Sequence, residues 1–222
     1  MTPDFDTELG TIRDELVRMT RLVGTAMNCG TQALLDADLT LAEAVIAADA
    51  RIDTMANDVE QRCFDLITDS APTPDQLRVV IGSLRIAASL ERMGDLAEHV
   101  AKQSRLRYPR TSVPRELRAT FAEMGDLAEA ILTTTGAMIG TDDVDLAEEV
   151  AGHDDRIDAL HRGLFAAVLA PTWEHGVEVA VDVTLLSRYY ERYGDHAVSV
   201  ARRVVTMVTG APYVGVVLES AR

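Results

Sequence analysis

The sequence has few cysteines and no long apolar run. Its two cysteines, Cys29 and Cys63, lie within helix-like segments, and a lone pair in a chain of 222 residues does not form a disulfide framework. No stretch approaches the ~18 uncharged apolar residues that a membrane span requires. The first residues, Met-Thr-Pro-Asp-Phe-Asp, are acidic and are followed by no signal-like apolar core. We therefore expect a cytoplasmic protein with reduced thiols and no direct membrane insertion.

Basic residues are outnumbered by acidic ones. The 21 lysines and arginines face 36 aspartates and glutamates, which gives a formal net charge of −15. Such an excess of carboxylates repels a phosphate backbone, so no nucleic acid is expected as a partner. The negative field favours metal cations or basic surfaces of another protein, although acidity alone more often serves solubility.

Aromatic residues make up only 5% of a chain that is 47% hydrophobic. A core must therefore be built mainly from Leu, Val, Ile, Ala and Met, a mixture that suits helices. Apolar residues recur at alternating steps of three and four, as in Leu90, Met93 and Ala97, which predicts helices packed side by side. The expected helices cover residues 5–35, 39–69, 74–106, 115–139, 144–169 and 172–209.

Two polar motifs occur once in each half of the chain. Asp49-Ala-Arg-Ile-Asp53 returns as Asp154-Asp-Arg-Ile-Asp158, and Glu91-Arg-Met-Gly-Asp95 returns as Glu191-Arg-Tyr-Gly-Asp195. Both pairs keep the same order, which indicates an internal duplication. The predicted fold is all-α, with two tandem three-helix bundles. The predicted divisions are a first bundle at 1–106, a linker rich in proline and arginine at 107–114, a second bundle at 115–210 and a tail at 211–222.

The repeated carboxylates are candidate metal ligands. Residues four apart lie on one face of a helix, so each motif presents two carboxylates at one place. If the second and third helices of each unit are neighbours, four carboxylates gather in a solvent-facing groove. The candidates are Asp49, Asp53, Glu91, Asp95, Asp154, Asp158, Glu191 and Asp195. Oxygen ligands suit hard cations such as magnesium, manganese or iron, and they specify zinc less well.

A simpler interpretation treats the same residues as ordinary solvated helix surface. The neutralising residues would be Arg51, Arg92, Arg156 and Arg192. Gly94 and Gly194, which precede the last aspartate of their motifs, cost about 1 kcal/mol each relative to alanine in a helix. We interpret both as sites of a tight helix crossing, in preference to close approach by a ligand.

The motifs, their order and their duplication resemble the PhoU family over about residues 7–209. The resemblance implies two three-helix bundles related by pseudo-twofold symmetry, in a cytoplasmic protein that forms a homodimer. It also implies negative regulation of the phosphate-starvation response and of phosphate uptake, by linking the ATPase subunit of a phosphate ABC transporter to a sensor histidine kinase. Surface iron or zinc clusters would fall on the eight candidate carboxylates. His196 stands where the first unit has Leu96, so the two sites need not bind the same metal.

Three functions stay open at this point. The leading hypothesis is a non-catalytic regulator, because no nucleophile and base stand at informative spacing and no G-x-x-x-x-G-K-[ST] phosphate loop is present. The second is a carboxylate-bridged metalloenzyme on a helical bundle. It lacks the Glu-x-x-His pattern of ferritin-like di-iron proteins, because no histidine here follows a glutamate by three residues. The third is a metal-free structural adaptor.

Overall fold

The computed structural model describes residues 5–211, and within that range it contains six long helices and no strand. The prediction of an all-α fold is confirmed. The first unit consists of α1 (Phe5–Asp36), α2 (Leu39–Ser70) and α3 (Pro74–Arg107). A short 3-10 helix, Arg115–Leu117, leads into the second unit, α4 (Arg118–Thr141), α5 (Leu146–Leu169) and α6 (Gly176–Thr209). Residues 212–222, most of the predicted tail, lie outside the described residues.

Capping residues set the helix boundaries that the sequence predicts. The Asp38 side chain accepts a hydrogen bond from the Leu41 backbone N–H at 3.0 Å, which caps the first turn of α2. Thr73 and Gln76 form a capping box at the start of α3, with Pro74 in the first turn. These side chains satisfy N–H groups that a helix start leaves without partners, so the chain begins each helix at a defined residue.

The start of the sixth helix was predicted four residues too early. Residues 171–175 form a turn, in which the Trp173 indole N–H donates to the Gly176 carbonyl at 2.9 Å. Trp173 also packs, partly buried, against the hydrophobic core. Pro171 marked the end of α5, but no signal in residues 172–175 marked where α6 begins.

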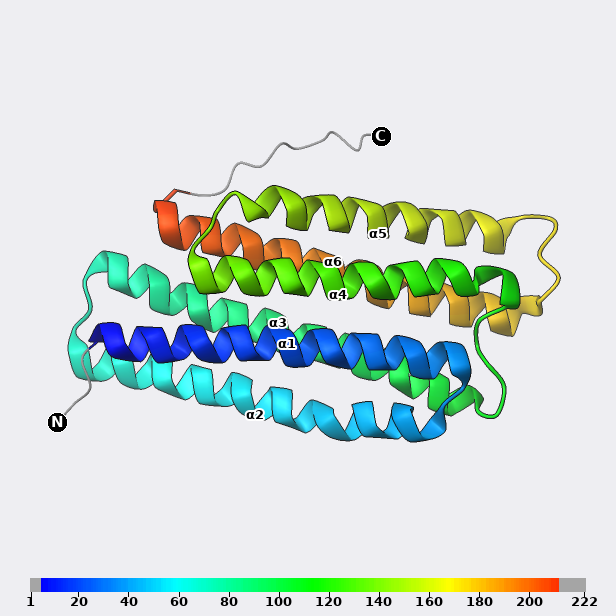
Figure 1. The fold of residues 1–222 in the computed structure, drawn as a ribbon, viewed down its shortest axis with the longest axis horizontal. Coiled ribbons are helices and arrows are strands. Elements are labelled where there is room, and N and C mark those ends of the chain that lie inside the picture. The colour runs from blue at the N-terminus through cyan, green and yellow to red at the C-terminus, as the bar shows by residue number, and fades with distance from the viewer. Residues whose placement is uncertain (1–4, 212–222) are drawn as a thin grey trace.

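The two units lie side by side and share one core. Figure 1 shows α1 beside α4 and α3 beside α6, with α2 and α5 on the two outer flanks. Buried residues of all six helices form one continuous cluster. Within it, the Thr31 hydroxyl of α1 lies 2.7 Å from the Tyr190 hydroxyl of α6, and both side chains are buried. The repeat therefore produces two bundles joined along their length.

The segment between the units packs against the first bundle. Ser112 and Val113 are buried, and the Ser112 hydroxyl donates to the Gln103 carbonyl at 3.4 Å. Just before this segment, Arg107 donates two hydrogen bonds to Asp182 of α6, at 2.7 and 2.9 Å. No helix within residues 5–211 has an apolar stretch long enough to span a lipid bilayer.

Candidate metal centres

The first carboxylate group lies between α2 and α3, where the sequence placed it. The two helices pack together, and Gly94 of α3 faces α2. A Cβ at Gly94 would lie 3.0 Å from Asp49 Oδ1 and 3.1 Å from Ile52 Cδ1. The glycine therefore allows a close helix approach, as predicted, and it also seats the Asp49 carboxylate against α3.

Three carboxylates of this group converge. Asp49, Asp95 and Glu98 each offer one oxygen, and these oxygens lie within 4.8 Å of one another. Glu98 was not among the predicted ligands, because it stands outside both repeated motifs and the second unit has Val198 at the matching position. Its position three residues after Asp95 could have identified it, because residues three apart share one face of a helix.

The electrostatics of the first group are those of crowded like charges. The pKa of Asp49 is raised to about 6, first by burial and then by the carboxylates of Glu98, Asp53 and Asp95, against a lowering by Lys102. Burial and Asp95 also raise the pKa of Glu91. Asp53 itself is exposed. The charges of the four predicted residues therefore affect one another. The three carboxylates that lie closest together are those of Asp49, Asp95 and Glu98.

The second group lies between α5 and α6 and repeats this geometry. A Cβ at Gly194 would overlap Asp154 Oδ1, so this carboxylate also sits against a glycine. The pKa of Asp154 is raised to about 7, first by burial and then by the carboxylates of Asp158, Asp195, Asp155 and Glu191. Burial and Asp195 raise the pKa of Glu191, against a lowering by Arg188.

Arginines neutralise the carboxylates only in part. Arg92 pairs with Asp95 at 2.8 Å and with Glu91 at 3.5 Å, as the solvated-surface interpretation expects. Arg156 pairs instead with Glu123 of α4, its Nε lying 2.7 Å from the carboxylate. In the second group the counter-charges come from Arg188 on Glu191 and Arg162 on Asp158, which were not predicted.

Two buried carboxylate oxygens in the second group have no hydrogen-bond partner among the described residues. They are Asp154 Oδ1 and Glu191 Oε2. A buried acceptor left without a partner costs about 1–3 kcal/mol, and more when it is charged. A cation bound to these oxygens would remove that cost, and an all-carboxylate donor set suits a hard ion. The residues present therefore fit a metal, although they select no particular one.

The carboxylates stand in grooves between paired helices, outside the bundle core. Asp49, Glu91, Asp154 and Glu191 are partly buried, and the core is filled by apolar side chains. Ligands of ferritin-like di-iron enzymes project into the bundle core. This placement favours a surface cluster over an enclosed catalytic site.

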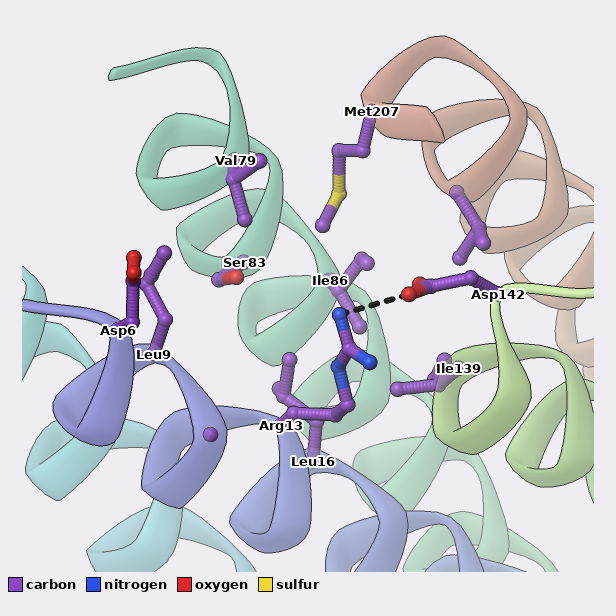
Figure 2. Close-up of a pocket in the computed structure, with 12 residues that line it drawn as sticks. Asp6, Leu9, Arg13, Leu16, Val79, Ser83, Ile86, Ile139, Asp142 and Met207 are labelled. Carbon is purple, nitrogen blue, oxygen red and sulfur yellow. Dashed lines mark ion pairs between the residues drawn. The ribbon is translucent and has the colours of Figure 1, made fainter. Parts of the chain in front are cut away.

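A separate cavity of about 320 Å³ lies at one end of the molecule, between the start of α1, the first half of α3 and the ends of α4 and α6. Figure 2 shows Arg13 and Asp142 pointing toward one another across it, with an ion-pair distance of 2.8 Å. Leu16, Ile86 and Met207 supply apolar wall. None of the candidate metal ligands lines this cavity, and its two facing charges neutralise each other.

The family model described as the PhoU domain matches this chain twice, at residues 16–104 and 121–204. The chain belongs to the PhoU family. Each match falls within one three-helix unit, which supports the internal duplication. The carboxylate pairs of both units, including Asp49 with Asp95 and Asp154 with Asp195, lie inside the matched residues of the PhoU domains.

Curated PhoU relatives are similar over almost the whole chain. "Phosphate-specific transport system accessory protein PhoU homolog 2" of Mycobacterium tuberculosis is 42% identical over 211 residues, which cover 95% of this chain and 99% of the relative. "Phosphate-specific transport system accessory protein PhoU homolog 1" of Mycobacterium leprae is 41% identical, with 95% of each chain covered.

Solved PhoU structures have the same fold. The crystal structure of PhoU from Pseudomonas aeruginosa has a TM-score of 0.82 and 26% identity, and covers 94% of this chain and 100% of that one. The structure of the phosphate transport system regulatory protein PhoU from Streptococcus pneumoniae has a TM-score of 0.85 at 23% identity, which supports the fold alone. It covers 95% of this chain and 99% of the other.

Proposed function

We propose that this protein negatively regulates the phosphate-starvation response and phosphate uptake. It acts as a cytoplasmic adaptor between the ATPase subunit of a phosphate ABC transporter and a sensor histidine kinase. The observation that carries this proposal is the 42% identity over 95% of the chain to a relative named as an accessory protein of phosphate-specific transport. The similarity extends through both units, so the proposal concerns the whole pair of bundles.

An adaptor needs surfaces that bind its partner proteins, and it needs no catalytic side chains. The candidate carboxylates are partly buried or exposed, so a partner or a cation can reach them. We therefore propose a non-catalytic protein. We also expect a homodimer, which light scattering coupled to gel filtration would detect as twice the chain mass of 24.1 kDa.

The proposal includes a metal-dependent element in each unit. The first group would use Asp49, Asp95 and Glu98, with Asp53 and Glu91 beside them, and the second would use Asp154, Asp158, Glu191 and Asp195. Iron, zinc, manganese or magnesium bound there would supply positive charge that offsets the crowded carboxylates. The glycines hold one carboxylate of each group against the partner helix, so the ligands are oriented before an ion binds.

The regulatory role is tested in a deletion strain. With ample phosphate, loss of this protein should derepress phosphate-uptake genes, and the wild-type chain should restore repression. Any second copy of the gene must be removed first, because it would mask the effect. Unchanged expression of those genes in the complete deletion would contradict the proposal.

The partner assignments are tested in the same strain. A tagged chain should recover the transporter ATPase subunit and a sensor histidine kinase from native cells, and metal analysis of the same preparation reports the bound ion. Recovery of neither partner would leave the adaptor role without support, whatever the metal content.

A further inference from the structure

A seam between α3 and α6 gathers positive charge in a chain whose net charge is −15. The two helices run antiparallel and join the two units (Figure 1). Arg85 and Ser89 lie one turn apart on α3, and Ser199 and Arg203 lie one turn apart on α6. Arg203 bridges the helices, because its Nη1 donates to Ser89 Oγ at 3.4 Å. We call these four residues the arginine–serine group.

The partners of the Arg203 guanidinium are neutral. Arg203 Nη1 also donates to the Ser199 carbonyl at 2.9 Å and to the Ser199 hydroxyl at 2.6 Å. Within residues 5–211, no carboxylate lies within ion-pair distance of Arg85 or Arg203. The pKa of Arg203 is lowered, first by burial and then by the positive charge of Arg85. Two cations are thus held together with no counter-charge from the described chain, a balance that a bound anion would correct.

Several hydrogen-bond donors of this group have no acceptor among the described residues. Arg203 uses only Nη1 toward the described protein, which leaves Nε and Nη2 to donate elsewhere. Arg85 is exposed. The Ser89 hydroxyl, which is buried, already donates to the Arg85 carbonyl at 3.0 Å, so Ser89 positions Arg203 instead of binding a ligand. The Ser199 hydroxyl accepts from Arg203 and retains its own hydrogen to donate.

We propose that the arginine–serine group binds a phosphate group. A phosphate presents several oxygens to two guanidinium forks at once, whereas a single carboxylate has two oxygens and is satisfied by one fork. Arg85 and Arg203 bind the anion, Ser199 donates one hydrogen bond, and Ser89 orients Arg203. The ligand is either inorganic phosphate or the phosphoryl end of a nucleotide. This site is separate from the metal groups and stands whether or not the regulatory role holds.

Equilibrium dialysis of the full chain with radiolabelled inorganic phosphate tests the site, in EDTA so that no metal-bound phosphate contributes. Arg203→Gln and Arg85→Gln should each weaken binding about tenfold or more, because each removes a charge-assisted contact. Arg105→Gln is the matched control, since Arg105 is an exposed arginine on the last turn of α3, and it should bind as wild type does. Variants are compared after circular dichroism has shown wild-type helicity.

A parallel arm with ATP separates the two sources. If inorganic phosphate binds and ATP does not displace it, the ligand is the free ion. If ATP binds while inorganic phosphate does not, and the same two substitutions weaken ATP, the ligand is a nucleotide phosphoryl group. Equal binding by all four proteins overturns the proposal, as does the absence of binding of either ligand at concentrations up to ~10 mM, a weak limit for a specific site.

Discussion

The two ends of the contact between α3 and α6 are related by the repeat, yet they are built from opposite chemistry. At one end Arg107 and Asp182 form a bidentate ion pair, in which Asp182 is 3% exposed. At the equivalent place 100 residues on, Met207 packs against Gly82 so closely that a Cβ there would overlap its sulfur. The two repeats therefore share the helix crossing but differ in the side chains that make contact at its two ends.

The two carboxylate groups also share a helix arrangement and differ in their side chains. Both keep the helix register that seats an aspartate on a glycine. The first group adds Glu98, which pairs with Lys102, whereas the second has Val198 at that position and holds two carboxylate oxygens without partners. The negative charge of the first group is therefore better balanced by protein partners than that of the second. We expect the second group to depend more strongly on a bound cation.

The largest expected effect comes from breaking the ion-pair end of the α3–α6 contact. Asp182→Ala should lower the free energy of unfolding by more than a substitution at the apolar end does, because it leaves the Arg107 guanidinium without its main partner. Met207→Ala, at the apolar end, should cost roughly 1 kcal/mol, because Met207 is only partly buried. Urea unfolding of both variants measures the difference. Equal losses would mean that the two ends contribute alike.

The next effect separates the two metal groups. At a cation concentration of about 100 times Kd, binding to the folded state alone adds about 2.7 kcal/mol of stability. Glu191→Ala/Asp195→Ala should remove more of this increment than Glu91→Ala/Asp95→Ala, because the second group has no Glu98 to retain the ion. Thermal melts with and without Mn²⁺, Fe²⁺, Mg²⁺ and Zn²⁺ give the increments.

The control for that experiment is the metal-free protein. Removing repelling surface carboxylates should then leave stability unchanged or slightly higher in both double variants. If every cation shifts wild type and both variants equally, the carboxylates are solvated helix surface and hold no specific ion.

A smaller effect concerns pH in the metal-free protein. The folded-state pKa of Asp154 is raised from 3.8 to about 7. Between these pH values the native state holds a proton that the unfolded state releases. The stability gained from this proton is therefore fully present below pH ~4 and is lost as the pH rises through ~7. Asp154→Asn should therefore raise the free energy of unfolding at pH 8 by on the order of 2 kcal/mol, after allowance for partial solvent exposure.

Asp49→Asn is the comparison for this pH effect. The pKa of Asp49 is raised from 3.8 to about 6, so its stabilisation is lost one pH unit lower and its gain at pH 8 should be about two-thirds as large. Urea unfolding in EDTA at pH 5 and pH 8 measures both. A wild-type protein whose stability does not change between these pH values would contradict the raised pKa values.

The sequence predicted those features that are encoded locally. Asp38 and Thr73 are recognisable helix caps, so the bounds of α2 and α3 were predicted to within about a residue. The repeated motifs also predicted which carboxylates lie together. A short turn joins α2 to α3, so α3 runs back along α2 and brings the two motifs side by side. Partners distant in the sequence left no local signal: Asp182 is 75 residues from Arg107, and Glu123 is 33 residues from Arg156. Glu98 was missed because the repeat does not reproduce it.

The smallest effect distinguishes the two glycines. In Gly94→Ala the new Cβ meets the buried Ile52 side chain at 3.1 and 3.2 Å as well as Asp49, and Ile52 has no room to yield. This strain opposes the helix-propensity gain of about 1 kcal/mol, and we expect a net loss of about 1 kcal/mol. In Gly194→Ala the close atom is Asp154 Oδ1, while Ile157 lies at an ordinary 3.6 Å. Asp154 can rotate away, so stability should hold or rise while cation binding weakens. Urea unfolding and metal titration of each variant separate the two outcomes, and a stable Gly94→Ala with intact cation binding would show that the first crossing is looser than these contacts indicate.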